Sequence, residues 1–387
     1  MALRLMLEPL DIWLFRDGRP FTAGSDALAR SRFPPSPYTV YGMLRSLLLF
    51  QAASRGVVTD LRFGAAVDHA VGAPDDFTRL SLRGPLLARW HGQRVIRYFP
   101  APRDLVWAGT DHQAQPLLPA AAPLDGMVSS GLRPLWVQQA EAPAGLGDAW
   151  LAEDAFHAYL AGAKTGEDSP SPLRGEPASA LYLRELRPGV GLDRQRRTAA
   201  EHLLYAVEYI RPRPGVGLVV DVLAGLDTAP MLLGFGGEGR GARCTTLALE
   251  AETPPPEVHR RVSASGRVKL VLATPALFAQ GWLPAWVDPA TLETRAGQPP
   301  LRLVAAAVPR GELIGSFDLV AGKPRPARRA VPAGSVYFFE EREPGAAAAA
   351  LARWYGQCLS DEHAAIGFGL SYAGVWDPLA LPPQGQA

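Results

Sequence analysis

The chain has 387 residues, of which 48% are hydrophobic, and its 39 lysines and arginines nearly balance its 38 aspartates and glutamates. This length is enough for two domains with separate cores, since single cores usually stop growing near ~250 to 300 residues. The balanced charge excludes a bulk positive field for nucleic acid, two cysteines exclude a disulfide framework, and the lack of long apolar runs excludes a membrane partner, so a cytoplasmic globular protein is expected.

The start of the chain predicts a strand followed by a loop that carries two arginines. Leucines alternate with other residues over positions 3–7, which is the period-two pattern of a half-buried strand. The loop that follows holds Arg16 and Arg19 between phenylalanines. Guanidinium groups bind phosphate oxygens and aromatic faces stack on bases, so this loop suits RNA. The alternative is that the arginines pair with Asp11 and Asp17 on a solvated turn.

A helix is expected directly after this loop. Ser36 is a suitable N-cap, Pro37 fits the first helical position, and Gly56 is a plausible terminator. Apolar residues recur at helical spacing over positions 40–48. The predicted helix N-terminus therefore lies beside the arginine-bearing loop, where its partial positive charge favours an anion.

A long insertion is expected after the first helix, over residues of about 60–180. It is rich in proline and glycine, with a predicted helix at 148–160 and a loop at 164–176. Strand patterns return after it, at 181–186, 203–210 and 218–223.

A glycine-rich segment at 234–243 satisfies the spacing of a dinucleotide-binding turn. That turn requires a helix after it, whereas residues 244–250 alternate like a strand, so a Rossmann site is not expected. Two interpretations remain open. The glycines either expose backbone N–H groups to phosphate oxygens, or form a bend that packs closely on a neighbouring element.

Residues 253–256 predict a stiff proline-rich connector between two units. Beyond it, the pattern predicts strands at 268–272, 301–308 and 336–339, a helix at 346–357 and a final strand at 366–376. A basic run at 323–329 is bounded by prolines and is expected to be an exposed strand edge or loop, unless it is an ordinary solvated charge run.

Together these segments resemble the RAMP superfamily of CRISPR proteins, and more narrowly the third Cmr subunit of type III-B effector complexes. The resemblance rests on residues 8–11, 15–21, 33–45, 197–205, 236–240, 323–326, 331–337 and 366–369. It implies an α+β fold of two ferredoxin-like, RRM-like domains in tandem, here 1–252 with the insertion and 257–387. It also implies a subunit that grips the 5′ repeat-derived tag of the guide RNA (crRNA) without cutting it. Its partners would be the large Cas10-type subunit and the backbone RAMP subunits.

The candidate RNA-binding residues are expected to converge from three parts of the chain. They are Arg16, Arg19, Phe21, Tyr38, Arg45, Gly236, Gly237, Arg240, Arg243, Lys323, Arg325, Arg328 and Arg329. Phe235 is a further stacking candidate, although it also fits a place in the core.

No catalytic site, metal site or cofactor is expected. The predicted first helix has no histidine, lysine or acidic residue from 38 to 51, and no histidine spacing suggests a metal ligand set. His363 could serve as a base for RNA cleavage, or could be an ordinary surface residue. Two alternatives to a non-catalytic RNA-binding subunit therefore stay open, namely a metal-independent endoribonuclease of the same superfamily and a scaffold that touches only proteins.

Overall fold

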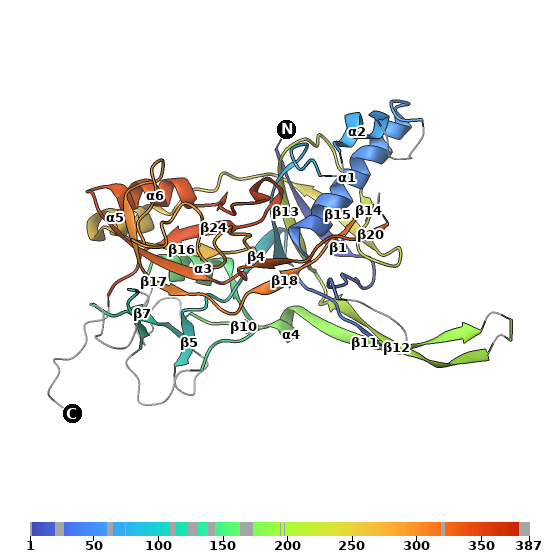
Figure 1. Ribbon diagram of the computed structural model, residues 1–387, viewed down its shortest axis with the longest axis horizontal. Helices are drawn as coiled ribbons and strands as arrows, with labels where there is room; N and C mark the ends of the chain where they lie inside the picture. Colours follow the sequence, from blue (N-terminus) through green and yellow to red (C-terminus); the bar gives the residue numbers. More distant parts are fainter. Residues whose placement is uncertain are drawn as a thin grey trace.

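Two antiparallel sheets form the framework of the protein (Figure 1). The computed structural model describes residues 2–19, 27–59, 65–73, 75–108, 113–121, 131–137, 144–162, 173–193, 195–196, 198–318 and 322–378. The larger sheet has the order β10-β9-β4-β3-β13-β1-β15-β14, and the smaller has the order β17-β22-β16-β24-β23. The fold is α+β, with few helices and a majority of strands.

The strands of the larger sheet come from the first two thirds of the chain. They are β1 Leu3–Pro9, β3 Ser81–His91, β4 Arg94–Pro100, β9 Ala149–Ala152, β10 Glu176–Pro177, β13 Val216–Ala224, β14 Leu232–Gly234 and β15 Gly241–Leu247. The smaller sheet contains β16 Arg267–Leu272, β17 Leu301–Ala307, β22 Val336–Glu341, β23 Gln357–Cys358 and β24 Leu370–Gly374.

A long hairpin projects from the body of the molecule (Figure 1). It consists of β11 Tyr182–Asp193 and β12 Thr198–Pro212, with the short β2 Leu28–Ala29 parallel to β12. Smaller ribbons pair β5 Leu105–Ala108 with β6 Gln113–Pro116, β7 Leu118–Pro119 with β8 Leu135–Trp136, β18 Glu312–Ile314 with β21 Arg328–Ala330, and β19 Phe317–Asp318 with β20 Lys323–Pro324.

The helices are α1 Pro37–Ser54, α2 Ala65–Val71, α3 Glu153–Leu160, α4 Ala178–Leu181, α5 Pro256–Ser265 and α6 Ala346–Trp354, with a 3-10 turn, η1, at Ala364–Ile366. The predicted first strand and first helix are confirmed, and Pro37 occupies the start of α1. Ser36 is the N-cap residue, as predicted, but its side chain makes no capping hydrogen bond; its carbonyl oxygen accepts from the Thr39 N–H at 2.9 Å.

One predicted helix is too long, and one helix was not predicted. The helix expected at 148–160 begins only at Glu153, because residues 149–152 form β9 and pair with β4. The connector expected at 253–256 ends at Pro256, which opens α5; proline is tolerated there because the first helical N–H groups have no intrahelical partner.

The insertion shares a core with the smaller sheet. Phe99 from β4 and Phe156 from α3 stack with ring centroids 4.0 Å apart, and both meet the edge of Tyr372 on β24. All three side chains are fully buried. A second core lies between α1 and the larger sheet, where Val40 and Leu44 pack against β1 and β13.

A buried network of charges joins the insertion to both sheets. Arg97 of β4 forms ion pairs with Glu153 of α3 and with Glu252, and its Nη1 lies 3.2 Å from the Tyr372 hydroxyl. The side chains of Arg97 and Glu252 are each only 7% exposed. Arg4 of β1 extends the network from Glu252, 3.2 Å away, to Asp221 of β13, 2.6 Å away. Although burial raises it, hydrogen bonds from Arg97 hold the pKa of Glu153 below its ordinary value.

We expect Arg97→Ala to lower the free energy of unfolding by about 3–5 kcal/mol, because it leaves Glu153 without its arginine partner and the buried Glu252 with Arg4 alone. Urea denaturation measures this loss. Arg260→Ala is the control, since Arg260 is 76% exposed and pairs with Glu257 on α5, so its loss should stay below about 1 kcal/mol.

The same deficit should shrink as the pH falls. A carboxylate with a lowered folded pKa adds stability that is present above its unfolded pKa and is lost as the pH drops through the folded pKa. Equal losses for the Arg97 and Arg260 variants, or a deficit that does not change in acid, would contradict a network held by charge.

Candidate nucleic-acid interface

The strands β18–β21 form an arm that leaves the smaller sheet after β17 and lies on the arginine-bearing loop. Gly18 of the loop and Gly315 of the arm meet so closely that a Cβ on Gly315 would lie 2.8 Å from the Gly18 Cα. Ion pairs hold the arm in place, from Glu312 to Arg32 and from Arg325 to Asp75. Segments some 300 residues apart therefore meet beside the start of α1.

The exposed cations of this region come from both segments. Arg16 is exposed, and Arg19, whose side chain is 72% exposed, lies 3.4 Å from the carboxylate of Asp17. On the arm, Lys323 and Arg329 are exposed, and neither forms an ion pair with a residue that the structure describes. A small cleft between loop and arm is lined by Arg16, Asp17, Arg32, Ser36, Thr39 and Leu313, among others.

Tyr38 and Arg45 of α1 lie in more enclosed surroundings. The Tyr38 ring packs among aromatic side chains, with centroids 5.3 Å from His363 and 4.9 Å from Phe368, and burial raises its pKa to about 12. Arg45 donates hydrogen bonds to the carbonyl oxygens of Gly72 and Ala73, just beyond the end of α2. Phe21, the other stacking candidate, lies outside the described residues.

The glycine-rich segment packs against Leu14, in the chain that follows β1. Gly236 has φ 93° and a Cβ there would lie 2.9 Å from the Leu14 carbonyl oxygen, while the Gly237 N–H donates to that oxygen at 2.8 Å. Phe235 is 1% exposed and contacts the rings of Trp13 and Phe15. This close packing is the second of the two interpretations of the glycines, and it places Phe235 in the core.

Arg240 lies at the base of the hairpin among carboxylates. Its guanidinium group lies 5.1 Å from the ring centroid of Tyr209 and 3.8 Å from both Asp11 and Glu238. Arg187 covers the same ring at 5.2 Å. Arg243, on β15, is exposed and forms no ion pair among the described residues.

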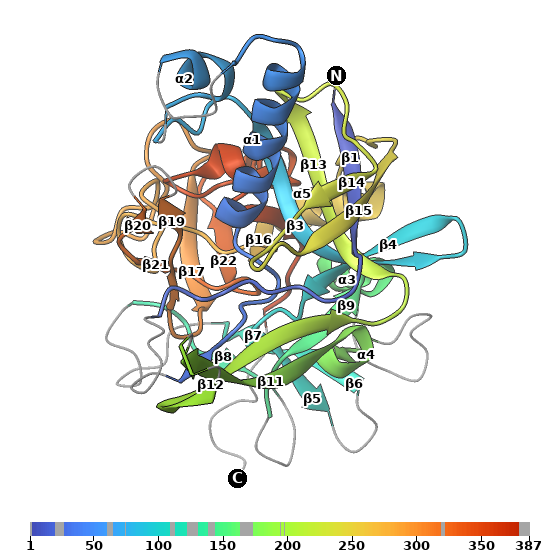
Figure 2. The same cartoon turned by 90° about the vertical axis from the view of Figure 1, so that its right-hand side faces the viewer.

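Most of the described candidate residues form two groups, whereas Tyr38 and Arg45 of α1 and Arg243 of β15 lie apart from both. The loop and arm carry one group, and the hairpin base carries the other. The chain leaving β1 runs between them (Figure 2), bridging to the hairpin at Trp13 and Ile210. From Asp11 to Arg16 it spans at most about 18 Å, and residues 12–15 are buried, so the two groups lie at the two ends of a short buried segment.

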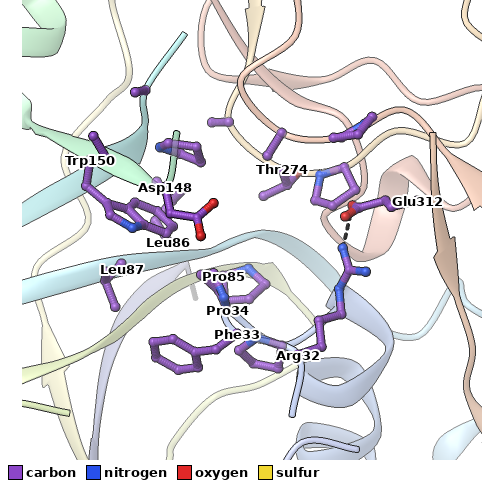
Figure 3. Close-up of a pocket in the computed structure, with 18 of the residues that line it drawn as sticks. Arg32, Phe33, Pro34, Pro85, Leu86, Leu87, Asp148, Trp150, Thr274 and Glu312 are labelled. Carbon is purple, nitrogen blue, oxygen red and sulfur yellow. Dashed lines mark hydrogen bonds and ion pairs between the residues drawn. The ribbon is translucent and has the colours of Figure 1, made fainter. Parts of the chain in front are cut away.

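A cavity of about 300 Å³, which the sequence did not reveal, opens between these elements (Figure 3). Phe33, Pro34 and Pro85 line one side of it, Trp150 and Asp148 another, and the Arg32–Glu312 pair a third. Its walls also include Tyr182 and Arg184 of the hairpin and Thr274 of the second unit. Aromatic rings beside a carboxylate, a hydroxyl and guanidinium groups suit a small polar aromatic group such as a nucleobase.

Other kinds of site find no support in the described ranges. They contain no cluster of three or more histidine, cysteine, aspartate or glutamate side chains that could hold a metal ion. Within the same ranges, no helix is both long enough and apolar enough to span a bilayer.

Comparison with known proteins decides the family. The model of the family described as CRISPR-associated protein (Cas_Cmr3) matches residues 5–376. The chain belongs to this family. The prediction of a Cmr3-type RAMP protein, made from the resemblance, is therefore confirmed, whereas no curated protein matches the sequence.

The comparison with solved structures returns chains of type III complexes. A chain in the cryo-EM structure of the Type III-B Cmr-beta bound to cognate target RNA and AMPPnP, state 1, is 17% identical with TM-score 0.48, over 87% of this chain and 86% of that one. A chain in the cryo-EM structure of the Type III-B Cmr-beta bound to cognate target RNA is 16% identical with TM-score 0.47, over 87% of this chain and 86% of that one. A chain of the Csm3-Csm4 subcomplex in the type III-A CRISPR-Cas interference complex is 10% identical with TM-score 0.38, over 88% of this chain and 94% of that one.

We expect Gly236→Ala to destabilise the protein by about 1 kcal/mol or more, because the added methyl group meets the Leu14 carbonyl and the positive φ disfavours alanine. Gly42→Ala is the matched control. Gly42 lies inside α1 with no atom within 4 Å of its Cβ position, so alanine there should stabilise the helix by up to about 1 kcal/mol. Urea denaturation of both variants tests this, and the same sign of change for both would count against the packing of the glycine-rich segment.

Proposed function

We propose that this chain is a non-catalytic guide-RNA subunit of a type III-B Cmr effector complex. It grips the 5′ repeat-derived tag of the crRNA and contacts the large Cas10-type subunit and the backbone RAMP subunits. One observation carries the RNA-binding part, namely the contact of the arginine-bearing loop with the arm at Gly18 and Gly315, beside the N-terminus of α1. Membership of the Cas_Cmr3 family supports the subunit role.

The charges at this contact favour phosphate binding. Several arginines there pair with carboxylates, as Arg19 does with Asp17 and Arg328 does with Glu362. Exposed pairs of this kind contribute only about 0.2–1 kcal/mol, so a phosphate can displace the carboxylate at low cost. Lys323 and Arg329 form no ion pair among the described residues, so a phosphate can bind them without displacing a carboxylate. The first turn of α1 contains no acidic residue that would oppose an anion at its N-terminus.

The proposed tandem of ferredoxin-like units, 1–252 and 257–387, has support in the strand orders. In a β-α-β-β-α-β unit the first strand lies between the third and the fourth. In the larger sheet β1 lies between β13 and β15, with α1 following β1, and in the smaller sheet β16 lies between β22 and β24, with α6 following β22. Each sheet is therefore compatible with such a unit that retains one helix of two.

The endoribonuclease alternative would depend on His363. This residue has φ 58°, its ring lies 4.6 Å from that of Phe77, and burial lowers its pKa. A neutral imidazole can act as a base, but this ring is packed edge-on against aromatic neighbours and half buried, which explains its position without catalysis.

Salt titration tests the RNA-binding proposal. With the full-length chain and a short fluorescein-labelled single-stranded RNA, we expect Arg329→Ala to weaken binding and to reduce the slope of log K against log salt by about 0.7, the value for one phosphate contact. Fluorescence anisotropy gives both quantities. Arg260→Ala, which removes an exposed arginine from α5, should change neither. A protein that binds no RNA, alone or in the assembled complex, would favour the scaffold alternative.

An assay in EDTA tests the endoribonuclease alternative. We expect the labelled RNA to remain intact with both the wild-type chain and His363→Ala, as resolved on a denaturing gel. Cleavage by the wild type that disappears in the His363 variant would replace the proposal with catalysis at this histidine.

A further inference from the structure

Two large apolar side chains stand exposed on the arm, each next to a cation. Leu313 of β18 is 66% exposed and lies directly opposite Arg329 of β21. Phe317 of β19 is 55% exposed and lies opposite Pro324, the residue after Lys323. Single exposed apolar residues are common on protein surfaces, but here two occur within five positions, and the strands that carry them pair with the cation-bearing strands β21 and β20.

From this arrangement we infer that the arm is a stacking platform for unpaired RNA bases. Phe317 provides the aromatic face for one base, Leu313 supports a neighbouring one, and Arg329, directly opposite Leu313, binds the phosphate beside them. Base stacking on an aromatic side chain tolerates any sequence, because every base has a π-face. The inference rests on the proposed function and names residues that sequence reasoning did not single out.

The composition of the arm favours RNA over a protein partner. The centre of a protein interface is usually depleted of charged residues, and of lysine in particular. On the arm Leu313 lies directly opposite Arg329, and four cations stand on the chain that pairs with the strands of Leu313 and Phe317: Lys323, Arg325, Arg328 and Arg329. Apolar faces close to cations suit a single strand of RNA, in which bases and phosphates lie side by side.

Several contacts also position the arm against the arginine-bearing loop and its surroundings. The Arg325 N–H donates to the Ser316 carbonyl oxygen at 2.9 Å, directly beside Phe317. The contact of Gly315 with Gly18 and the ion pairs of Glu312 with Arg32 and of Arg325 with Asp75 fix the arm to the first unit. A pre-ordered platform loses little conformational entropy when a base stacks on it.

Substitution of Phe317 tests this inference with the full-length chain and the same labelled RNA. Phe317→Ala should weaken binding roughly 5- to 150-fold, the range that corresponds to the loss of one stacked base, and should leave the salt slope unchanged because no phosphate contact is removed. Phe317→Trp should restore the affinity. Phe50→Ala is the matched control, because Phe50 on α1 is similarly exposed, at 62%, and its loss should not change binding.

The outcomes separate the platform from the proposed function. If Arg329→Ala weakens binding and Phe317→Ala does not, RNA binding stands and the platform is disproved. If Phe317→Ala leaves RNA binding intact but releases the chain from the assembled complex, the arm is a protein contact and the inference fails. If the wild-type chain and complex bind no RNA at all, the proposed function fails with it. Unfolding curves for both Phe317 variants, expected to match the wild type, exclude misfolding as the cause.

Discussion

The buried ion network around Arg97 holds the architecture together. Arg97 and Glu252 are 155 residues apart in sequence, and their pairing fixes the end of the first unit against β4 of the insertion. Arg4 ties the same carboxylate to the larger sheet, and the Tyr372 hydroxyl ties Arg97 to the smaller one. A buried charge without its partner is costly, so the parts must assemble together in this one register.

This constraint places the arm on the arginine-bearing loop. The arm belongs to the second unit, between β17 and β22, whereas the loop follows β1 of the first. With both sheets fixed by the network, Gly315 reaches Gly18 closely enough that neither position has room for a side chain. The candidate interface therefore depends on how the two sheets are joined. Residues of the buried ion network, which lie away from the proposed RNA contacts, contribute to it through the fold.

Local features of the fold could be predicted from the sequence, and distant pairings could not. The first helix followed from Pro37 and the spacing of its apolar residues, both of which act within a few turns of chain. Helix α5 was missed because three prolines in a row favour an extended connector, although the last of them suits a first helical position. Nothing local marks Arg97 as buried, since its partners come from α3 and from Glu252.

The candidate site shows the same division. Sequence reasoning singled out arginines by their type and their loops, but the structure decides which of them lie on the surface facing outward. Arg45 is turned toward the carbonyl groups that follow α2, and Arg240 toward the carboxylates and Tyr209 at the hairpin base. The cavity lined by Trp150, Tyr182 and Thr274 brings together three segments that share no motif, so only the tertiary fold could reveal it.

The near-neutral charge of the chain fits a surface of exchangeable ion pairs. A strongly basic surface would bind any nucleic acid, whereas here most cations near the loop and the arm are matched by a carboxylate of the same chain. An RNA phosphate that binds one of these cations must replace its carboxylate partner at a position set by the fold. Each such replacement contributes little to the free energy of RNA binding. Binding by such a surface requires several contacts at once, which favours a strand held in one conformation over a freely diffusing one.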